Sequence, residues 1–544
     1  MTAGRYNRQE ALWGREGQIL LADSTLVIIG GKNLGKEVLK SASILGVATR
    51  YSHNDGRPDH CAGSIHLVDN RRVYEDESFL DIPLPKRAFA SEELARIVTS
   101  TLNEDCEIIA DNALCDPSYL ESLSAHSTVD FIVDTSNDPE SQRHCIRFSR
   151  GQFSRKEGKR RIPVLLACAN HLGGIVRYYD PEECPDVQVI EGFGGQRQGI
   201  IMSNIFAGVI VEEYRKNLFR LNSDRFKDLP EESRPRAANG NRIDYFKVVG
   251  ATRPLARDVK YSIAGDKRIL DPREIDYGLE QITDGCFKDA KVLVLGCGAL
   301  GNYMVDILAR LGLERLDVMD FDVFEEHNLN RQPLGYDGVG RLKCHVLAEM
   351  VEKISKGNTS STPLFAKIGG PLTGDQLTDL RKHKVDGKEC KILYEDWFSE
   401  NRYDVVIAGF DNNSARALMN SYAIKVGFRY IDAGSSPTGG KVLTYVPGKT
   451  KCLNCSNHID RAAKASEKRA EENRLSRERQ GLGCRFAEPS VNMSNQTTAG
   501  MAVAELRKLI SDDYGSVLAD RVRYEANEGQ RLQARVFNKP CNCK

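Results

Sequence analysis

The residues best suited to chemistry form a glycine-rich turn in the C-terminal part of the chain. Gly296, Gly298 and Gly301 follow an apolar strand pattern and precede an apolar helical pattern. Backbone amides at such a helix start attract anions, and glycines let them approach a phosphate closely. The next strand pattern, 315–319, ends at Asp320, where a carboxylate can accept hydrogen bonds from a ribose. The spacing therefore predicts a nucleotide or dinucleotide site.

Two cations after this turn favour a triphosphate over a nicotinamide cofactor. Asn328, Arg331 and Gln332 lie in the segment Asn-Leu-Asn-Arg-Gln, and Lys343 follows it. Fixed positive charges neutralise phosphate groups. A dinucleotide-dependent oxidoreductase remains an alternative, and it predicts bound NAD or FAD and no release of pyrophosphate.

A second group of residues has the chemistry of a metal site. Cys452 and Cys455 form a Cys-x-x-Cys pair, and Cys541 and Cys543 form a Cys-x-Cys pair near the C-terminal end of the sequence. Four thiolates in a reducing compartment are typical ligands of a closed, tetrahedral structural zinc site. Free thiols and a redox pair remain the alternatives. A zinc ion here would attach the C-terminal tail to the preceding domain.

Composition narrows the class of protein. The chain has 544 residues, which predicts more than one domain, and its 76 basic and 76 acidic residues cancel. This balance gives no reason to expect nucleic acid or an anionic membrane as a partner. No apolar run approaches the roughly 18 residues of a membrane span, and the first residues are unlike a secretory signal. We therefore expect a cytoplasmic protein without membrane contact.

The chain contains an internal repeat. A strand at 26–29, a glycine turn at 30–35 and a helix to about 45 resemble the pattern that begins at 292. Three later segments recur in the same order: 131–137 as 405–411, 173–179 as 439–445, and 202–208 as 493–500. A duplication explains these matches better than two unrelated nucleotide folds in series. We expect domains at 1–215 and 286–544 with a polar connecting segment at 216–285.

These motifs together resemble the ThiF/MoeB/HesA superfamily of ubiquitin-activating-enzyme-like adenylyltransferases. The resemblance implies an α/β fold of two tandem Rossmann-like ThiF domains, each a mainly parallel, doubly wound sheet with helices on both faces. The two domains would form an intramolecular pseudo-dimer. It also implies ATP and Mg²⁺ as cofactors beside Zn²⁺. Adenylation of this kind requires positioning and charge neutralisation rather than covalent chemistry by the protein.

The resemblance also implies roles for individual residues. The three glycines and Asp320 would bind the nucleotide, with Asn328 and Gln332 beside it. Arg331 and Lys343 would stabilise phosphate charge, and Asp411 would hold magnesium. Asp411 could instead cap the helix that begins near Asn412, and the two roles are compatible. The position that matches Asp411 in the first half is Asn137.

The two halves are expected to have divided the work. The first half lacks an Asn-Leu-x-Arg-Gln segment and is predicted to be catalytically silent. It keeps the motif Arg-Tyr-x-Arg-Gln, whose second arginine, Arg8, matches a residue that in the resembled family reaches into the ATP site of the partner. The second half has no such arginine at its start. A solvated surface arginine is the alternative for Arg8.

The expected reaction continues from adenylate to thioester. Cys484 lies where relatives carry an acyl-accepting cysteine, and Arg485 could lower its pKa. An inert cysteine is the alternative. The charged segment 456–483 matches a crossover loop that covers an extended substrate tail in relatives, and a solvated helix or mobile loop is the plain reading.

The resemblance implies a ubiquitin-like or sulfur-carrier protein with a C-terminal Gly-Gly as substrate. A conjugating enzyme or a sulfurtransferase is a further possible partner. The pseudo-dimer would need no second chain. Two other functions remain open: adenylation of a small peptide precursor in natural-product biosynthesis, and a non-catalytic binding scaffold.

Overall fold

The computed structural model describes most of the chain. The described residues are 5–50, 63–73, 77–151, 162–194, 197–224, 258–262, 287–369, 390–468, 491–511, 519–526, 531–535 and 540–543. Within them, the side chains at 7, 8, 11, 531 and 535 lie outside the description. Among these described residues, no helix is both long and apolar enough to cross a membrane.

The N-terminal part alternates strands and helices. In chain order its elements are α2 (Asn7–Ala22), β1 (Leu26–Ile29), α3 (Asn33–Leu45), β2 (Ile65–Val68), β3 (Ser78–Phe79), β4 (Ile82–Pro83), α4 (Ala90–Ile97), the π-helical turn η1 (Val98–Leu102), β5 (Ile108–Asp111), α5 (Pro117–His126), β6 (Phe131–Asp134), α6 (Pro139–Gly151), β7 (Val164–Ala169), β8 (Gly173–Tyr179), α7 (Ile200–Leu221) and β9 (Val259–Ser262).

The C-terminal part follows the same alternation. Its elements are β10 (Lys291–Leu295), α11 (Ala299–Ala309), β11 (Arg315–Asp320), the 3₁₀ turns η3 (Glu326–Asn328) and η4 (Tyr336–Gly338), α12 (Lys343–Ile354), β12 (Pro363–Ile368), β13 (Lys391–Leu393), α14 (Glu395–Glu400), β14 (Val405–Ala408), α15 (Asn413–Val426), β15 (Tyr430–Ser436), β16 (Gly439–Tyr445), α16 (Leu453–Asn457), α18 (Asn492–Ile510), β17 (Arg521–Glu525) and β18 (Arg531–Arg535).

Two large sheets share one plan. The N-terminal sheet has the order β5-β2-β1-β6-β7-β8-β9, and the C-terminal sheet has the order β13-β12-β11-β10-β14-β15-β16-β17-β18. In both sheets the strands from the first edge to β7 or β15 are parallel, and the following strands are antiparallel. Strand β9 lies within the segment that we expected to connect the halves, and it pairs with β8 at the edge of the N-terminal sheet.

The strands form where the sequence is continuously apolar. Strands β1, β6 and β14 are buried at every position, as expected for parallel strands with both faces covered. Helix α3 ends at Gly46, whose φ of 89° is the left-handed conformation that terminates helices. The predicted strand at 26–29 and the predicted helix end near 45 are confirmed.

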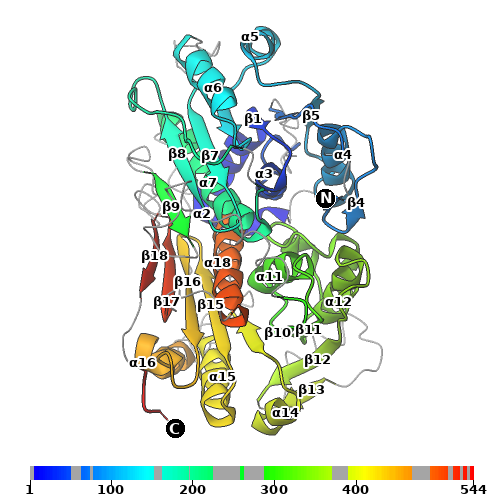
Figure 1. Ribbon diagram of the computed structural model, residues 1–544, viewed down its shortest axis with the longest axis vertical. Coiled ribbons are helices and arrows are strands. Elements are labelled where there is room, and N and C mark those ends of the chain that lie inside the picture. Colours follow the sequence, from blue (N-terminus) through cyan, green and yellow to red (C-terminus); the bar gives the residue numbers. More distant parts are fainter. Residues whose placement is uncertain are drawn as a thin grey trace, which may run out of the picture.

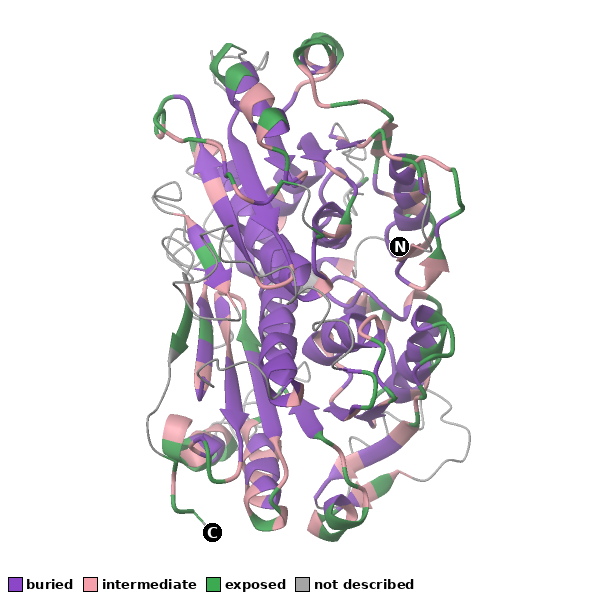
Figure 2. Ribbon diagram, in the orientation of Figure 1, coloured by how far each residue is buried: buried purple, intermediate pink, exposed green. Residues whose placement is uncertain are grey.

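Helices α7 and α18 join the two sheets. They lie side by side at the centre of the molecule, with the N-terminal sheet above and the C-terminal sheet below (Figure 1). Both are buried along almost their whole length, as the purple ribbons in Figure 2 show. We call the whole contact region between the two halves, with α7 and α18 at its centre, the seam.

Two glycines allow the seam helices to approach closely. A Cβ atom on Gly208 of α7 would lie 2.5 Å from the Met493 carbonyl oxygen and 2.2 Å from Thr497 Oγ1 of α18. In return, a Cβ atom on Gly500 of α18 would lie 2.6 Å from Ile205 Cγ1 of α7. Each helix therefore offers a glycine to the other, which is the reciprocity that a two-fold contact has.

Buried polar groups also cross the seam. Lys40 Nζ lies 2.5 Å from Glu37 Oε2 and 2.6 Å from Asp306 Oδ2, and all three side chains are almost fully buried. Burial opposes ionisation of Asp306, but Lys40 and Arg310 outweigh it and bring the pKa of Asp306 to about 2. Asn492 Nδ2 donates to the Ser41 carbonyl at 2.8 Å. The halves are thus held by paired charges as well as by apolar packing.

Candidate functional site

Two of the three glycines in the turn of the C-terminal part, Gly296 and Gly301, occupy positions where only glycine fits. Gly296 has φ of 86°, and a Cβ atom on Gly301 would lie 1.8 Å from the Gly296 carbonyl oxygen. Gly298 is the N-cap of α11, and no described side chain caps that helix. A Cβ atom on Gly298 would meet nothing within 4 Å. The first turn of α11 is therefore open, with backbone N–H groups available to an anion.

Asp320 ties the glycine turn to the end of β11. Its Oδ2 accepts a hydrogen bond from the Cys297 backbone N–H at 2.5 Å, and its Oδ1 accepts one from the Asp322 backbone N–H at 2.7 Å. Burial and the nearby charge of Asp322 raise the pKa of Asp320 to about 6, and Lys343 opposes this shift. Each carboxylate oxygen keeps a second acceptor site for a ribose hydroxyl.

The two predicted cations lie close to this carboxylate. Lys343 begins α12, is buried, and its Nζ lies 3.2 Å from Asp322 Oδ2. Burial disfavours its charge, but Asp322 and Asp320 outweigh that effect, so the pKa of Lys343 is raised, while Arg331 acts against the rise. Arg331 is also buried, and its Nη1 donates to the His327 carbonyl at 2.8 Å. Asp320, Arg331 and Lys343 thus form one electrostatic group.

The Asn-Leu-Asn-Arg-Gln segment leaves polar atoms unsatisfied at this place. Asn328 has a structural role, since its Oδ1 accepts from the Glu325 backbone N–H at 3.2 Å. By contrast, Asn330 Nδ2 and Gln332 Oε1 are buried without a hydrogen-bond partner. Orphaned buried polar atoms are rare and suit a site completed by a ligand.

Asp411 lies on the neighbouring strand end. A Cβ atom on Gly409, two residues earlier, would lie 3.2 Å from the Gly301 backbone nitrogen, so β14 ends beside the glycine turn. Asp411 is exposed and is not the helix cap that we considered: the cap of α15 is Asn412, whose side chain accepts from the Ala415 backbone N–H. The carboxylate of Asp411 is therefore not used up in capping.

The start of the expected crossover loop lies against the same helix. Residues 459–468 are helical. Asn413 Nδ2 donates to Ser466 Oγ at 2.9 Å, and Ser414 Oγ donates to Glu467 Oε1 at 2.7 Å. Cys484 and the remainder of this segment lie outside the described residues. The described part is therefore a helix anchored next to Asp411.

The N-terminal arm reaches toward the C-terminal site. Tyr6 is fully buried, and Asn103 Nδ2 donates to its hydroxyl at 3.2 Å. Gln9 Nε2 donates across the seam to the Asn330 carbonyl at 3.5 Å, a long hydrogen bond. Arg8 lies in the first turn of α2, between these two residues, and its side chain is outside the described part.

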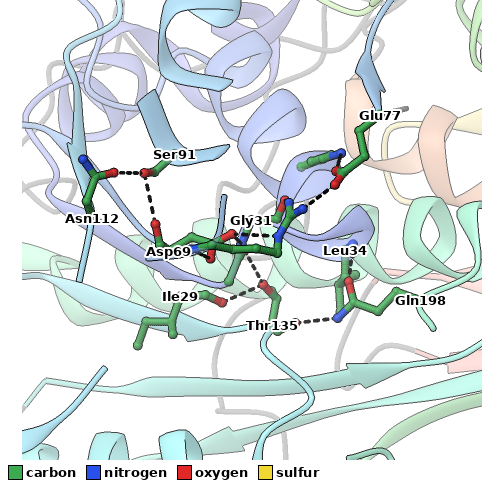
Figure 3. A network of polar contacts seen from close by, with 12 residues as sticks. Ile29, Gly31, Leu34, Asp69, Glu77, Ser91, Asn112, Thr135 and Gln198 are labelled. Atoms are coloured by element: carbon green, nitrogen blue, oxygen red, sulfur yellow. Dashed lines mark hydrogen bonds and ion pairs between the residues drawn. The ribbon is translucent and has the colours of Figure 1, made fainter. Parts of the chain in front are cut away.

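The matching turn in the N-terminal part is closed by its own side chains. Gln198 Oε1 accepts from the Leu34 backbone N–H at 2.8 Å, and Gln198 Nε2 donates to the Thr135 carbonyl at 2.7 Å, as Figure 3 shows. Arg71 crosses the turn and donates to the Gly31 carbonyl at 3.2 Å. Asn137 uses its amide in two backbone hydrogen bonds with Ala169.

The four cysteines of the predicted metal site come together. The sulfur atoms of Cys452, Cys455, Cys541 and Cys543 all lie within 4.8 Å of one another. The Cys452–Cys543 and Cys455–Cys543 sulfur pairs are separated by 3.8 and 3.4 Å. A tetrahedral ion with bonds of about 2.3 Å to sulfur places its ligands about 3.8 Å apart. The cluster therefore has the size to hold a metal ion.

Sequence reasoning missed several residues at these sites. It did not single out Asp322 as the partner of Lys343, although the Asp-Phe-Asp pattern after β11 was a usable signal. It also missed Gln198 and Arg71, which close the N-terminal turn. Gln198 is far from that turn in the sequence, and no local sequence pattern predicts a contact over that separation.

The C-terminal part of the chain is similar to known proteins. The model of the ThiF family matches residues 284–544. A NEDD8-activating enzyme E1 catalytic subunit from Dictyostelium discoideum is 29% identical over 231 residues, which cover 40% of this chain and 44% of the relative. A probable adenylyltransferase/sulfurtransferase MoeZ from Mycobacterium tuberculosis (strain CDC 1551 / Oshkosh) is 31% identical over 145 residues, 26% of this chain and 31% of the relative.

Among solved structures, E. coli MccB with SeMet MccA aligns with 70% of this chain and 97% of that chain, at 20% identity and a TM-score of 0.37. The chain spans less than half of the length of the two curated relatives above. The matched part contains the open glycine turn, the cationic segment and the cysteine cluster. Residues 284–544 therefore form a domain of the ThiF family, and their curated relatives are ubiquitin-activating-enzyme-like proteins and adenylyltransferases.

Proposed function

We propose that this protein is an ATP-dependent activating enzyme for a ubiquitin-like or sulfur-carrier protein. The observation that carries the proposal is the open first turn of α11, with Asp320, Arg331 and Lys343 grouped beside it. The names of the relatives, a NEDD8-activating enzyme and an adenylyltransferase/sulfurtransferase, support the same reaction class.

The proposed reaction is an exchange at the α-phosphorus of ATP. A carboxylate oxygen of the substrate's C-terminal glycine attacks this phosphorus, the bond to the bridging oxygen breaks, and pyrophosphate leaves. The backbone N–H groups of the α11 turn bind phosphate, Asp320 accepts from the ribose, and Arg331 and Lys343 offset the growing negative charge. Asp411, exposed beside the turn, supplies a carboxylate for Mg²⁺.

The orphaned atoms of the cationic segment fit a nucleotide. Asn330 Nδ2 is a donor and Gln332 Oε1 is an acceptor, and both are buried without partners. A nucleotide base or ribose presents both hydrogen-bond donors and hydrogen-bond acceptors. Leaving both atoms unpaired costs about 1–3 kcal/mol each, so a ligand that pairs them gains affinity.

The proposal assigns the N-terminal part a supporting role within an intramolecular pseudo-dimer. The equal strand orders, the reciprocal glycine contacts of the seam and the Gln9–Asn330 hydrogen bond support it. In this proposal Arg8, next to Gln9, adds a third positive charge to the phosphates. The closed turn at Gln198 agrees with a silent N-terminal site.

Two further steps belong to the proposal. Cys484 accepts the activated acyl group as a thioester, with AMP as the leaving group, before transfer to a conjugating enzyme or a sulfurtransferase. The four-cysteine cluster holds structural Zn²⁺, which fixes the tail of the chain to the end of β16 through α16. Its four thiolates leave no open coordination position, so its role is stability.

The test is pyrophosphate–ATP exchange with a panel of purified proteins that end in Gly-Gly, with matched panels ending in Gly-Ala and of short peptides. We expect exchange that depends on one of the Gly-Gly proteins and Mg²⁺. Asp411→Ala and Arg8→Ala should lower exchange, and Arg15→Ala, on the same helix as Arg8, should not. Cys484→Ala should keep exchange and lose the thioester. Exchange with peptides alone would contradict the protein substrate, and binding of NAD without exchange would overturn the reaction.

A further inference from the structure

A cavity lies on the seam, beside the closed turn of the N-terminal part. Its volume is about 460 Å³, and both halves contribute to its wall. The N-terminal half supplies the start of α3 and residues near β3, and the C-terminal half supplies the ends of α11, α12 and α18. Its charged lining residues are Lys36, Glu37, Glu77, Arg310, Lys356 and Arg507.

Arg507 on α18 is the distinctive residue of this cavity. It is only 3% exposed, and its Nη1 donates to the His171 carbonyl at 3.2 Å. Its Nε and Nη2 atoms are buried without a hydrogen-bond partner. These two nitrogens lie on one edge of the guanidinium, the edge that binds a carboxylate or phosphate through two parallel hydrogen bonds. A buried cation with this edge unpaired is unfavourable unless an anion completes it.

Most other charges around the cavity are already paired. Lys36 Nζ lies 2.7 Å from Glu77, Glu37 binds Lys40, and Arg310 binds Asp306 at 3.0 Å. Lys356 is exposed and makes no ion pair with a described residue. Among the described residues, no acidic side chain forms an ion pair with Arg507 or Lys356, so two side-chain cations at the cavity lack an anionic side-chain partner. The C-terminal ends of α11 and α12 add partial negative charge, but each amounts to about half a charge at most.

The cavity is separate from the proposed nucleotide site. Helices α11 and α12 begin at the open glycine turn and at Lys343, and they end at the cavity with Ala309 and Ile354. A helix of 12 residues such as α12 is about 18 Å long. One ligand of this cavity's size therefore does not reach both ends.

We propose that this cavity binds a small phosphorylated molecule, with the phosphate held by Arg507 and assisted by Lys356. A phosphomonoester carries close to two negative charges near pH 7, which matches these two cations, whereas a single carboxylate carries one. The ligand would complete the guanidinium edge and pack against residues from both halves. It would thus favour the joined arrangement of the halves.

The test uses inorganic phosphate as the probe, with the full-length protein. Phosphate is titrated by calorimetry against sodium chloride at equal ionic strength, in the Lys343→Ala background to weaken binding at the nucleotide site. We expect one phosphate per chain. Arg507→Lys keeps the positive charge but cannot form the bidentate pair of hydrogen bonds, so the Kd for phosphate should rise by about tenfold or more. Lys356→Ala should raise it about two- to fivefold.

Controls keep the outcome decisive. Lys353→Ala removes an exposed cation from the same helix that does not line the cavity, and it should leave the Kd unchanged. Formate in place of phosphate tests a carboxylate, and it should bind at least about tenfold more weakly. If Arg507→Lys does not fold, Lys356→Ala against Lys353→Ala decides the question. Unaltered phosphate binding in the cavity variants, or no binding in the Lys343→Ala protein, would overturn the proposal.

Discussion

The two glycine turns of this chain have the same backbone geometry, but the C-terminal turn is open and the N-terminal turn is closed by side chains. In both, the outer glycines pack so closely that a Cβ atom on Gly35 or Gly301 would lie 1.7 or 1.8 Å from a carbonyl oxygen. In both, an aspartate at the end of the next strand accepts a backbone hydrogen bond from the turn: Asp69 from Gly31 and Asp320 from Cys297.

The difference lies in what covers the helix start. Lys32 occupies the position that Gly298 has in the C-terminal turn. Gln198 Oε1 accepts the hydrogen bond of the Leu34 backbone N–H, which would otherwise be available to an anion. Arg71 stands where the C-terminal part has Asp322, and it bridges the turn instead of pairing with a lysine. The backbone of a glycine turn can thus be kept while two side chains, Gln198 and Arg71, close it.

The largest expected effect comes from matched substitutions of the outer glycines. Gly301→Ala and Gly35→Ala introduce the same clash with a carbonyl oxygen and should destabilise the protein by similar amounts, about 3 kcal/mol. Only Gly301→Ala should lower pyrophosphate–ATP exchange per folded molecule, by at least about 100-fold. Exchange is measured at low temperature with the folded fraction followed by circular dichroism. Equal loss in both variants would break the comparison.

A second pair of substitutions separates binding from stability. Gly298→Leu places a side chain in the open space above the α11 turn, where a Cβ atom meets nothing within 4 Å. We expect ATP affinity to fall about tenfold or more with little change in the melting temperature. Lys32→Leu at the matching place should leave ATP affinity unchanged. Titration with fluorescent ATP reports both, and unchanged affinity in Gly298→Leu would place the nucleotide elsewhere.

The four-cysteine cluster is a further difference between the C-terminal and the N-terminal halves. Zinc analysis should give one ion per chain, and Cys541→Ser should lose it and lower the melting temperature by several degrees. Cys115→Ser is the matched control, because Cys115 and Cys145 form a close thiol pair in the N-terminal part, with sulfur atoms 3.7 Å apart. Zinc content should not change in that variant. A zinc-free wild type with ordinary stability would contradict this assignment.

The last expected effect is a pH dependence of the stability, which arises from Asp320. Its folded pKa of about 6 lies above its ordinary value of 3.8, so the folded state binds the proton more tightly than the unfolded state. Its contribution to stability is therefore fully present below pH 4 and is lost as the pH rises to about 6, by up to about 3 kcal/mol. Asp320→Asn should lack this decline. Urea unfolding from pH 4 to 7 measures it, and parallel curves would refute it.

Local features of the fold could be predicted from the sequence because they rest on short patterns. A few consecutive residues are enough to recognise an apolar strand, a glycine turn or a cysteine pair. The closing of the N-terminal turn could not be predicted in this way, because seven strands and several helices separate Leu34 from Gln198 along the chain. Asp411 and Asn412 are both good caps, and only the backbone geometry shows that Asn412 takes that role.

The reciprocal glycines of the seam have a consequence for how the protein behaves when scarce. Separate subunits that meet through such a surface dissociate on dilution, whereas two surfaces tethered in one polypeptide keep a high effective concentration. In two identical subunits, every substitution changes both copies of the turn. In this chain each turn has its own residues, so a substitution that fills one turn leaves the other unchanged. Covalent linkage therefore frees one glycine turn to close while the other stays open.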